Sequence, residues 1–247
     1  MKSTKSHYFD GTNYFPHRKA LHNEIIQYFL EDSQKNGDEP IAFLLGGGSA
    51  SGKSTYGEHQ EEILNNMNKF PVYIDSDLIK EKIPEYSSLK ITNPLEAADI
   101  VHDESSDVAK ELLERAIQES YDIIFDGTMK NEEKYISLIS KLKEKGYEVF
   151  AIIVDVPIEH AFKMADMRFE IEGRLVSKKT ILETHIGVSR TFNKIKEMFD
   201  GYVLWDNSKY GEEGTIFAEK NEEGEWIKDE NRLQQFYQKA NHILEID

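Results

Sequence analysis

Eight consecutive residues match the G-x-x-x-x-G-K-[ST] pattern of a phosphate-binding loop. They are Gly47, Gly48, Ser49, Ala50, Ser51, Gly52, Lys53 and Ser54, and Thr55 follows them. In such a loop the glycines allow a backbone approach to phosphate that a Cβ would block, and the lysine reaches the β- and γ-phosphates. The serine hydroxyl is the expected Mg²⁺ ligand. The pattern therefore predicts a site for ATP or GTP with Mg²⁺.

The chemistry of this loop requires a strand before it and a helix after it, so that backbone N–H groups surround the phosphate at the helix N-terminus. Residues 41–45, IAFLL, are a short continuous apolar run that is typical of a buried parallel strand. A helical pattern follows from about 53 to 67. A glycine-rich turn with an exposed lysine is the alternative, and this order of elements disfavours it.

Acidic residues follow several other apolar runs, where a doubly wound sheet collects its ligands. Asp77 comes after the run at 72–74 and is a candidate general base that takes the proton from an attacking hydroxyl. It also precedes LIKEKI, so a helix-capping role stays open.

A second acid, Asp126, ends the run at 123–125, where a carboxylate usually holds Mg²⁺ directly or through water. Thr128 lies close behind it as a candidate substrate contact. Because D-G-T is also good turn chemistry, a purely local role is the alternative.

Two arginines, Arg168 and Arg174, lie near the end of one predicted helix and in the loop to the next. Phosphoryl transfer needs cations that neutralise charge on the phosphoryl oxygens, and arginines on a mobile lid are a common solution. Solvated surface arginines are the alternative.

Apolar runs alternate with helical patterns along most of the chain, which predicts an α/β fold: a doubly wound, mainly parallel sheet of about five strands. We expect one domain over residues 1–247, with a kinase core at 41–208. Residues 1–16 are expected to be disordered and 17–31 to form a helix. The tail at 209–247 predicts a hairpin and a closing helix. The further predicted helices lie near 94–119, 131–145, 157–170 and 178–199, and the further strands at 149–154 and 202–205.

The composition excludes several classes of protein. Lys and Arg total 30 against 46 Asp and Glu, a formal net charge of −16 that disfavours nucleic acid as a partner. The absence of cysteine removes disulfides, thiolate nucleophiles and Cys-based zinc sites. No run approaches the roughly 20 apolar residues of a membrane helix, so no membrane association is expected, and we expect a cytoplasmic protein.

Five segments, in this order and spacing, resemble the zeta toxin family of P-loop kinases. They are LLGGGSASGKST, YIDSDLIK, HDESS, IIFDGTMKN and RFEIEGR, and the resemblance covers about residues 41–208. It implies a kinase that uses ATP to phosphorylate a sugar hydroxyl of a nucleotide sugar, UDP-N-acetylglucosamine.

The resemblance also implies roles for single residues. Lys53 matches the P-loop lysine, Asp77 the general base, and Arg168 and Arg174 the arginines that clamp the γ-phosphate. Asp126 and Thr128 match the E/D-G-T element, with Asp126 where the type members have glutamate. His102, Glu104 and Ser105 fall where substrate-side contacts occur, although HDESS also fits a solvated helix face.

Other functions stay open beside this one. Family relatives include phosphotransferases that act on other small molecules, such as antibiotics or dinucleotides. A nucleotide-dependent switch that turns over no metabolite is a second class of function. A cognate antitoxin protein is a further partner that the resemblance implies.

Overall fold

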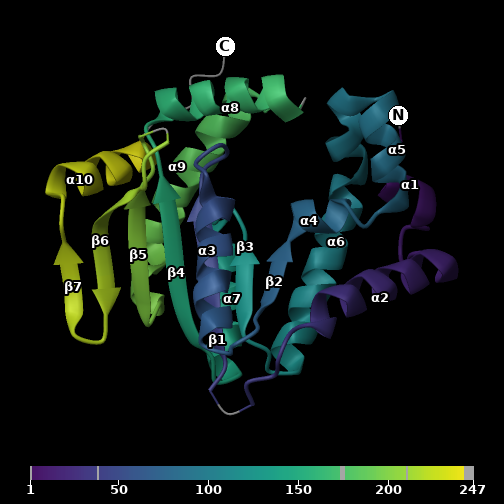
Figure 1. The fold of residues 1–247 in the computed structure, drawn as a ribbon, viewed down its shortest axis with the longest axis horizontal. Helices are drawn as coiled ribbons and strands as arrows, with labels where there is room; N and C mark the ends of the chain where they lie inside the picture. The colour runs from purple at the N-terminus through teal and green to yellow at the C-terminus, as the bar shows by residue number, and fades with distance from the viewer. Residues whose placement is uncertain (1, 38, 173–175, 210, 242–247) are drawn as a thin grey trace.

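One seven-stranded sheet forms the centre of the fold, in the order β2-β3-β1-β4-β5-β6-β7 (Figure 1). The structure is a computed structural model that describes residues 2–37, 39–172, 176–209 and 211–241. The strands are β1 (Ile41–Gly47), β2 (Val72–Asp75), β3 (Ile123–Asp126), β4 (Glu148–Asp155), β5 (Gly201–Asp206), β6 (Thr215–Asn221) and β7 (Gly224–Ile227).

The first five strands are parallel, with β1 in the middle between β3 and β4. This confirms the predicted doubly wound sheet. The predicted count of five strands is corrected to seven, because the C-terminal hairpin does not stand apart from the sheet. Its strands β6 and β7 extend the β5 edge in antiparallel pairing. Adding the hairpin to that edge pairs backbone groups of β5 that would otherwise need another partner.

Helices precede, separate and follow the strands. They are α1 (Thr4–Tyr8), α2 (Pro16–Glu31), α3 (Lys53–Asn66), α4 (Ser76–Lys80), α5 (Pro84–Thr92), α6 (Pro94–Gln118), α7 (Glu132–Glu144), α8 (Ile158–Glu172), α9 (Lys178–Ile195) and α10 (Glu230–Gln238), with short 3₁₀ turns at Lys196–Met198 and Lys239–Asn241. The sequence did not predict α5, and it suggested a short helix near α4 only as the alternative role of Asp77 as a cap. In the described ranges, every helix is too short or too polar to cross a membrane.

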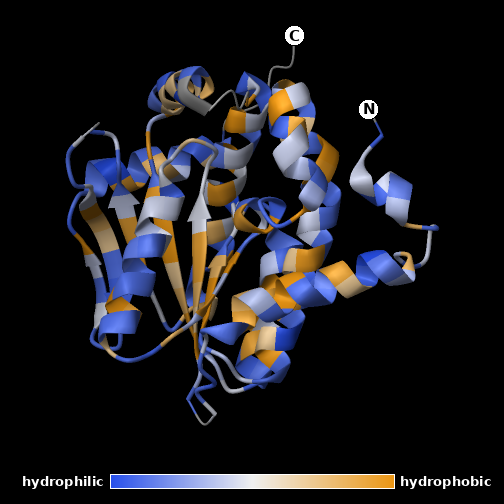
Figure 2. Ribbon diagram, turned by 45° about the vertical axis from the view of Figure 1, so that its right-hand side comes forward, coloured by the Kyte–Doolittle hydropathy of each residue, from blue (hydrophilic) through white to orange (hydrophobic). Residues whose placement is uncertain are grey.

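The parallel strands are apolar on both faces because helices cover both. Leu44 belongs to the core on the side of α6, α7 and α9, whereas its neighbour Leu45 packs on the opposite side with Leu64 of α3. Ile153 and Ile152 divide in the same way, as side chains along a strand alternate between its faces. Figure 2 shows the resulting apolar strands between helices whose outer faces are hydrophilic.

The N-terminal segment is folded over its described residues, which corrects the predicted disorder of 1–16. It forms α1 and a short antiparallel bridge between Phe9 and Tyr14. The Tyr14 hydroxyl donates to Asp107 of α6 at 2.7 Å, and the buried Thr4 hydroxyl donates to the Ile100 carbonyl at 3.4 Å. Sequence patterns missed this segment because its partners lie about ninety residues away.

A buried ion network attaches α2 to α5 and α6. The Arg18 guanidinium contacts Glu104 through Nε at 2.5 Å and Nη2 at 2.9 Å, and it also holds both oxygens of Glu85 at 2.8 Å. His22 Nε2 lies 2.7 Å from the same Glu104 carboxylate. Burial alone would raise the pKa of Glu104, but the hydrogen bonds from His22 and Arg18 bring it down to about 2.

This pKa makes part of the stability dependent on pH. The folded value lies below the ordinary value, so the stabilisation is complete above about pH 4.5 and is lost as the pH falls towards 2. We expect Glu104→Gln to lower the free energy of unfolding at neutral pH by about 2–3 kcal/mol, and to flatten its decline between about pH 5 and 2. Urea unfolding at several pH values measures both quantities.

Glu111→Gln is the matched control. Among the described residues, the Glu111 carboxylate forms an ion pair only with Lys19, and this pair lies on the surface. It should change stability by less than about 1 kcal/mol. If the free energy of unfolding of Glu104→Gln declined between about pH 5 and 2 as steeply as that of the wild type, the pH dependence would not come from Glu104.

Candidate active site

The phosphate loop joins the end of β1 to the start of α3, as the pattern requires. Ala50 and Gly52 have left-handed backbone conformations, with φ of 63° and 81°. Gly52 is the N-cap of α3 and supplies no side-chain hydrogen bond to the helix. The first N–H groups of α3 are therefore available to an anion, and the helix dipole favours negative charge there.

The loop is held from outside by side chains of distant elements. Thr184 of α9 accepts a hydrogen bond from the Ser49 amide at 2.9 Å. Asn207, directly after β5, donates to the Ser51 carbonyl at 2.9 Å, and a Cβ on Gly52 would approach its amide nitrogen to 2.4 Å. Sequence reasoning missed Thr184 and Asn207 as site residues. The only signal was the position of Asn207 just behind an apolar run.

Lys53, the first residue of α3, forms an ion pair with Asp126 at the end of β3. The Asp126 carboxylate is buried and also accepts a hydrogen bond from the Tyr73 hydroxyl at 3.3 Å. The strand register explains this meeting, since Asp126 lies beside Leu45 of β1 and beside Asp75 of β2. The two residues predicted for phosphate and metal binding therefore lie next to each other.

The two acids at the end of β2 and the start of α4 have different surroundings. Asp75 caps α4, accepting the Asp77 amide at 2.8 Å, and burial raises its pKa. The capping role considered for Asp77 thus belongs to Asp75. The Asp77 side chain is 40% exposed and accepts a hydrogen bond from Lys80 at 2.8 Å. Its carboxylate remains accessible from the cleft.

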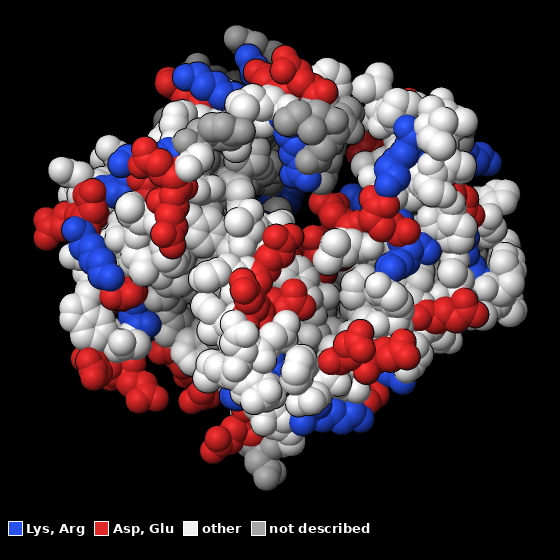
Figure 3. Space-filling model, viewed as in Figure 1, with Lys and Arg blue, Asp and Glu red and all other residues white. Residues whose placement is uncertain are grey.

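A cleft of about 540 Å³ brings most of the predicted site residues together. Its lining consists of residues 47–55 with Glu58, Asp77, Thr128, Met164, Met167, Arg168 and Val176. Figure 3 shows a hollow in the upper half of the molecule, with acidic side chains along the rim on the α4 side. The phosphate loop, the candidate base and one candidate arginine thus share one cavity.

Among the described residues, four candidates do not line this cleft: Asp126, His102, Glu104 and Ser105. Asp126 is buried and contacts the lining residue Lys53. Glu104 is fully buried and bound to Arg18 and His22, so its carboxylate faces α2 rather than the phosphate loop. His102 is exposed on α6, close enough to Asp77 and Lys80 to experience their charges. Arg174 lies outside the described residues.

Among the described residues, no group of three or more His, Asp or Glu side chains could hold a metal ion by itself. The candidate metal ligands Ser54 and Asp126 are oxygen donors, which suits a hard cation. A cation bound there would need further ligands, such as water or nucleotide phosphates.

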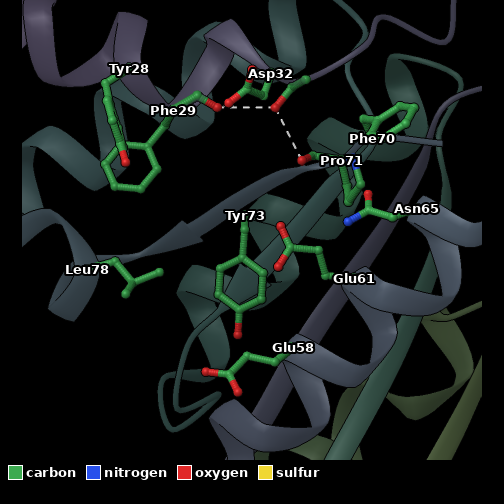
Figure 4. Close-up of a pocket in the computed structure, with 11 residues that line it drawn as sticks. Tyr28, Phe29, Asp32, Glu58, Glu61, Asn65, Phe70, Pro71, Tyr73 and Leu78 are labelled. Carbon is green, nitrogen blue, oxygen red and sulfur yellow. Dashed lines mark hydrogen bonds between the residues drawn. The ribbon is translucent and has the colours of Figure 1, made fainter. Parts of the chain in front are cut away.

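A second cavity, of about 370 Å³, lies between α2, α3 and β2 (Figure 4). Tyr28 and Phe29 of α2 lie across it from Glu58 and Glu61 of α3, with Tyr73 of β2 between. Burial and then the Glu58 charge raise the pKa of Glu61. Glu58 lines both cavities, whereas none of the predicted site residues lines this second one.

Comparison with known proteins agrees with the family resemblance of the sequence motifs. The zeta toxin family model matches residues 27–217. Toxin PezT of Streptococcus pneumoniae is 27% identical over 142 residues, which are 57% of this chain and 54% of that protein. The calmodulin calcium-dependent NAD kinase of Arabidopsis thaliana is 30% identical over 123 residues, 46% of this chain and 23% of the kinase. The chain thus spans about half the length of the first relative and less than a quarter of the second.

The solved structure of AvrRxo1-ORF1:-ORF2 with ATP has a similar fold. Its TM-score is 0.77 at 18% identity, and the alignment covers 100% of this chain and 85% of that one. The likeness extends over the hairpin and α10 as well as the kinase core. Since the family model matches most of the sequence and the phosphate loop and Asp77 share one cleft, the chain belongs to the zeta toxin family.

Proposed function

We propose that this protein is an ATP-dependent phosphotransferase that transfers the γ-phosphate to a hydroxyl of a small molecule. The observation that carries the proposal is the common cleft, in which Asp77 faces the same space as Lys53 and Arg168. A phosphate donor bound at the loop would place its terminal phosphate between these groups. The ATP in the solved structure of similar fold supports the choice of nucleotide.

Each residue has a distinct role in this proposal. Asp77 takes the proton of the acceptor hydroxyl, and Lys80 holds the carboxylate in place through its 2.8 Å contact. Lys53 and Arg168 stabilise the charge of the phosphoryl oxygens, and Arg174 joins them as the second lid arginine.

Magnesium is the metal that fits the available oxygen donors, the Ser54 hydroxyl and the Asp126 carboxylate. It would neutralise phosphate charge when bound. Without a nucleotide, Lys53 neutralises the charge of the Asp126 carboxylate through their ion pair. In our proposal, Lys53 turns to the β- and γ-phosphates when a nucleotide binds.

The acceptor we favour is a nucleotide sugar such as UDP-N-acetylglucosamine, which the family resemblance supports. A dinucleotide is the second candidate, because one relative at 30% identity is an NAD kinase. Thr128 lines the cleft and His102 lies near Asp77, so both are proposed for the acceptor side. We also propose a cytoplasmic location and a cognate antitoxin, supported by the relative named as a toxin.

Removing the base should separate catalysis from binding. We expect Asp77→Asn to lower kcat by about 10²- to 10⁴-fold, because the acceptor hydroxyl keeps its proton, while the Kd for ATP changes less than about threefold. Single-turnover transfer and calorimetric titration with ATP measure the two quantities. Asp10→Asn, an exposed position whose turn accepts asparagine equally well, is the control. Full transfer activity in Asp77→Asn would exclude this mechanism.

The class of function is tested by following labelled phosphate. We expect wild-type protein to move label from γ-labelled ATP to UDP-N-acetylglucosamine and to leave oligonucleotides unlabelled, with Asp77→Asn as the inactive control. Label on NAD instead would identify the dinucleotide, and not the nucleotide sugar, as the phosphate acceptor. Nucleotide binding without transfer to any hydroxylated metabolite would favour a switch and contradict the kinase.

A further inference from the structure

A buried carboxylate connects the C-terminal segment to the kinase core. Asp155, the last residue of β4, accepts hydrogen bonds from Lys239 at 2.6 and 2.8 Å and from Arg232 of α10 at 2.7 Å. Arg232 Nε also lies 3.1 Å from Asp206 at the end of β5. Two cations of the tail therefore meet the acidic ends of two adjacent strands.

This cluster is electrostatically balanced although it is buried. Burial alone would raise the pKa of Asp155, but His185, Lys239 and Arg232 hold it well below its ordinary range. Burial lowers the pKa of Lys239, and the Asp155 carboxylate opposes that shift. A charge left alone at such a depth is strongly unfavourable, so each partner depends on the others.

The other side of Asp155 faces the phosphate loop through His185. His185 Nδ1 lies 3.8 Å from the carboxylate, beyond hydrogen-bond distance, and Nε2 lies 3.1 Å from the Ser49 carbonyl, to which it donates in the tautomer with the proton on Nε2. The fully buried ring lies directly against Gly48, where an added Cβ would come within 2.1 Å of it. The ring is therefore packed closely against the backbone of the loop.

We propose that α10 and the turn at Lys239–Asn241 form part of the nucleotide site. Arg232 and Lys239 fix the Asp155 carboxylate, Asp155 orients His185, and His185 holds the Ser49 backbone. Lys239, Arg232, Asp155 and His185 are thus positioning residues, since they act on the phosphates only through the loop. The inference rests on the proposed binding of ATP by this loop, and it assigns a function to α10 and the turn after it, which lie beyond the residues matched by the family model.

The experiment compares nucleotide affinity in variants at the two ends of this connection. We expect His185→Leu and Lys239→Met to raise the Kd for AMP-PNP with Mg²⁺ by about 10- to 100-fold, because the loop N–H groups lose their alignment. Calorimetric titration well below the Tm of each variant keeps folding out of the measurement. Lys194→Met is the control: Lys194 lies on α9 like His185, and the change removes only a surface ion pair with Glu132 of α7. Its Kd should stay within about twofold of the wild type.

Two further variants separate positioning from simple stability. His185→Gln keeps an N–H donor for the Ser49 carbonyl and should recover most of the affinity. The Kd of the double variant His185→Leu/Lys239→Met should exceed that of the weaker-binding single variant by no more than about threefold. Both changes break the same connection, so their effects should not add. If Lys239→Met does not fold, His185→Leu carries the test, because it leaves Asp155 with both cations.

The outcomes distinguish this inference from the proposed function. Variants that have a lower Tm but bind AMP-PNP like the wild type would overturn the positioning role and leave ATP binding intact. Wild-type protein that does not bind AMP-PNP would overturn both. Weaker binding in the two variants, with recovery in His185→Gln, supports the role of the tail.

Discussion

A loop that offers backbone N–H groups to phosphates has few of them left for hydrogen bonds of its own. The phosphate loop between β1 and α3 has two left-handed residues, Ala50 and Gly52, and it turns the N-terminus of α3 towards the cleft. Its shape therefore depends on contacts from elsewhere in the chain. Thr184, His185 and Asn207 supply them from α9 and from the end of β5.

The parallel sheet explains how these distant side chains arrive at one place. Four of the five parallel strands, all except the central β1, end in a carboxylate at the same edge of the sheet, at Asp75, Asp126, Asp155 and Asp206. Each is neutralised or used differently: Asp75 caps α4, Asp126 pairs with Lys53, and Asp155 and Asp206 bind cations of the C-terminal segment. This pairing offsets part of the negative charge of a chain with net charge −16 near the proposed nucleotide site.

Local patterns were sufficient for the features that depend on neighbours in sequence. The apolar runs predicted the five parallel strands, and the glycine spacing predicted the loop at the end of β1, because each is determined within a few residues. The C-terminal hairpin and α10 were predicted as elements for the same reason. Their attachment to β5 and to Asp155 was not, since it depends on contacts between segments far apart in the sequence.

The same limit explains the residues that were misplaced. Glu104 has the chemistry of a substrate contact, and only the partner Arg18, 86 residues away, reveals that it is buried. The N-terminal segment is polar enough to suggest disorder until Tyr14 meets Asp107. The capping role considered for Asp77 was also misplaced, because only the backbone geometry of α4 shows that Asp75 is the cap.

The central claim is that this loop receives the phosphates of ATP opposite Asp77. A crystal structure with AMP-PNP and Mg²⁺ tests it most directly. The account predicts the γ-phosphate within reach of Lys53 and facing the Asp77 carboxylate, with the Lys53–Asp126 ion pair opened. Phosphates bound elsewhere, or bound with that ion pair intact and Asp77 turned away, would contradict it.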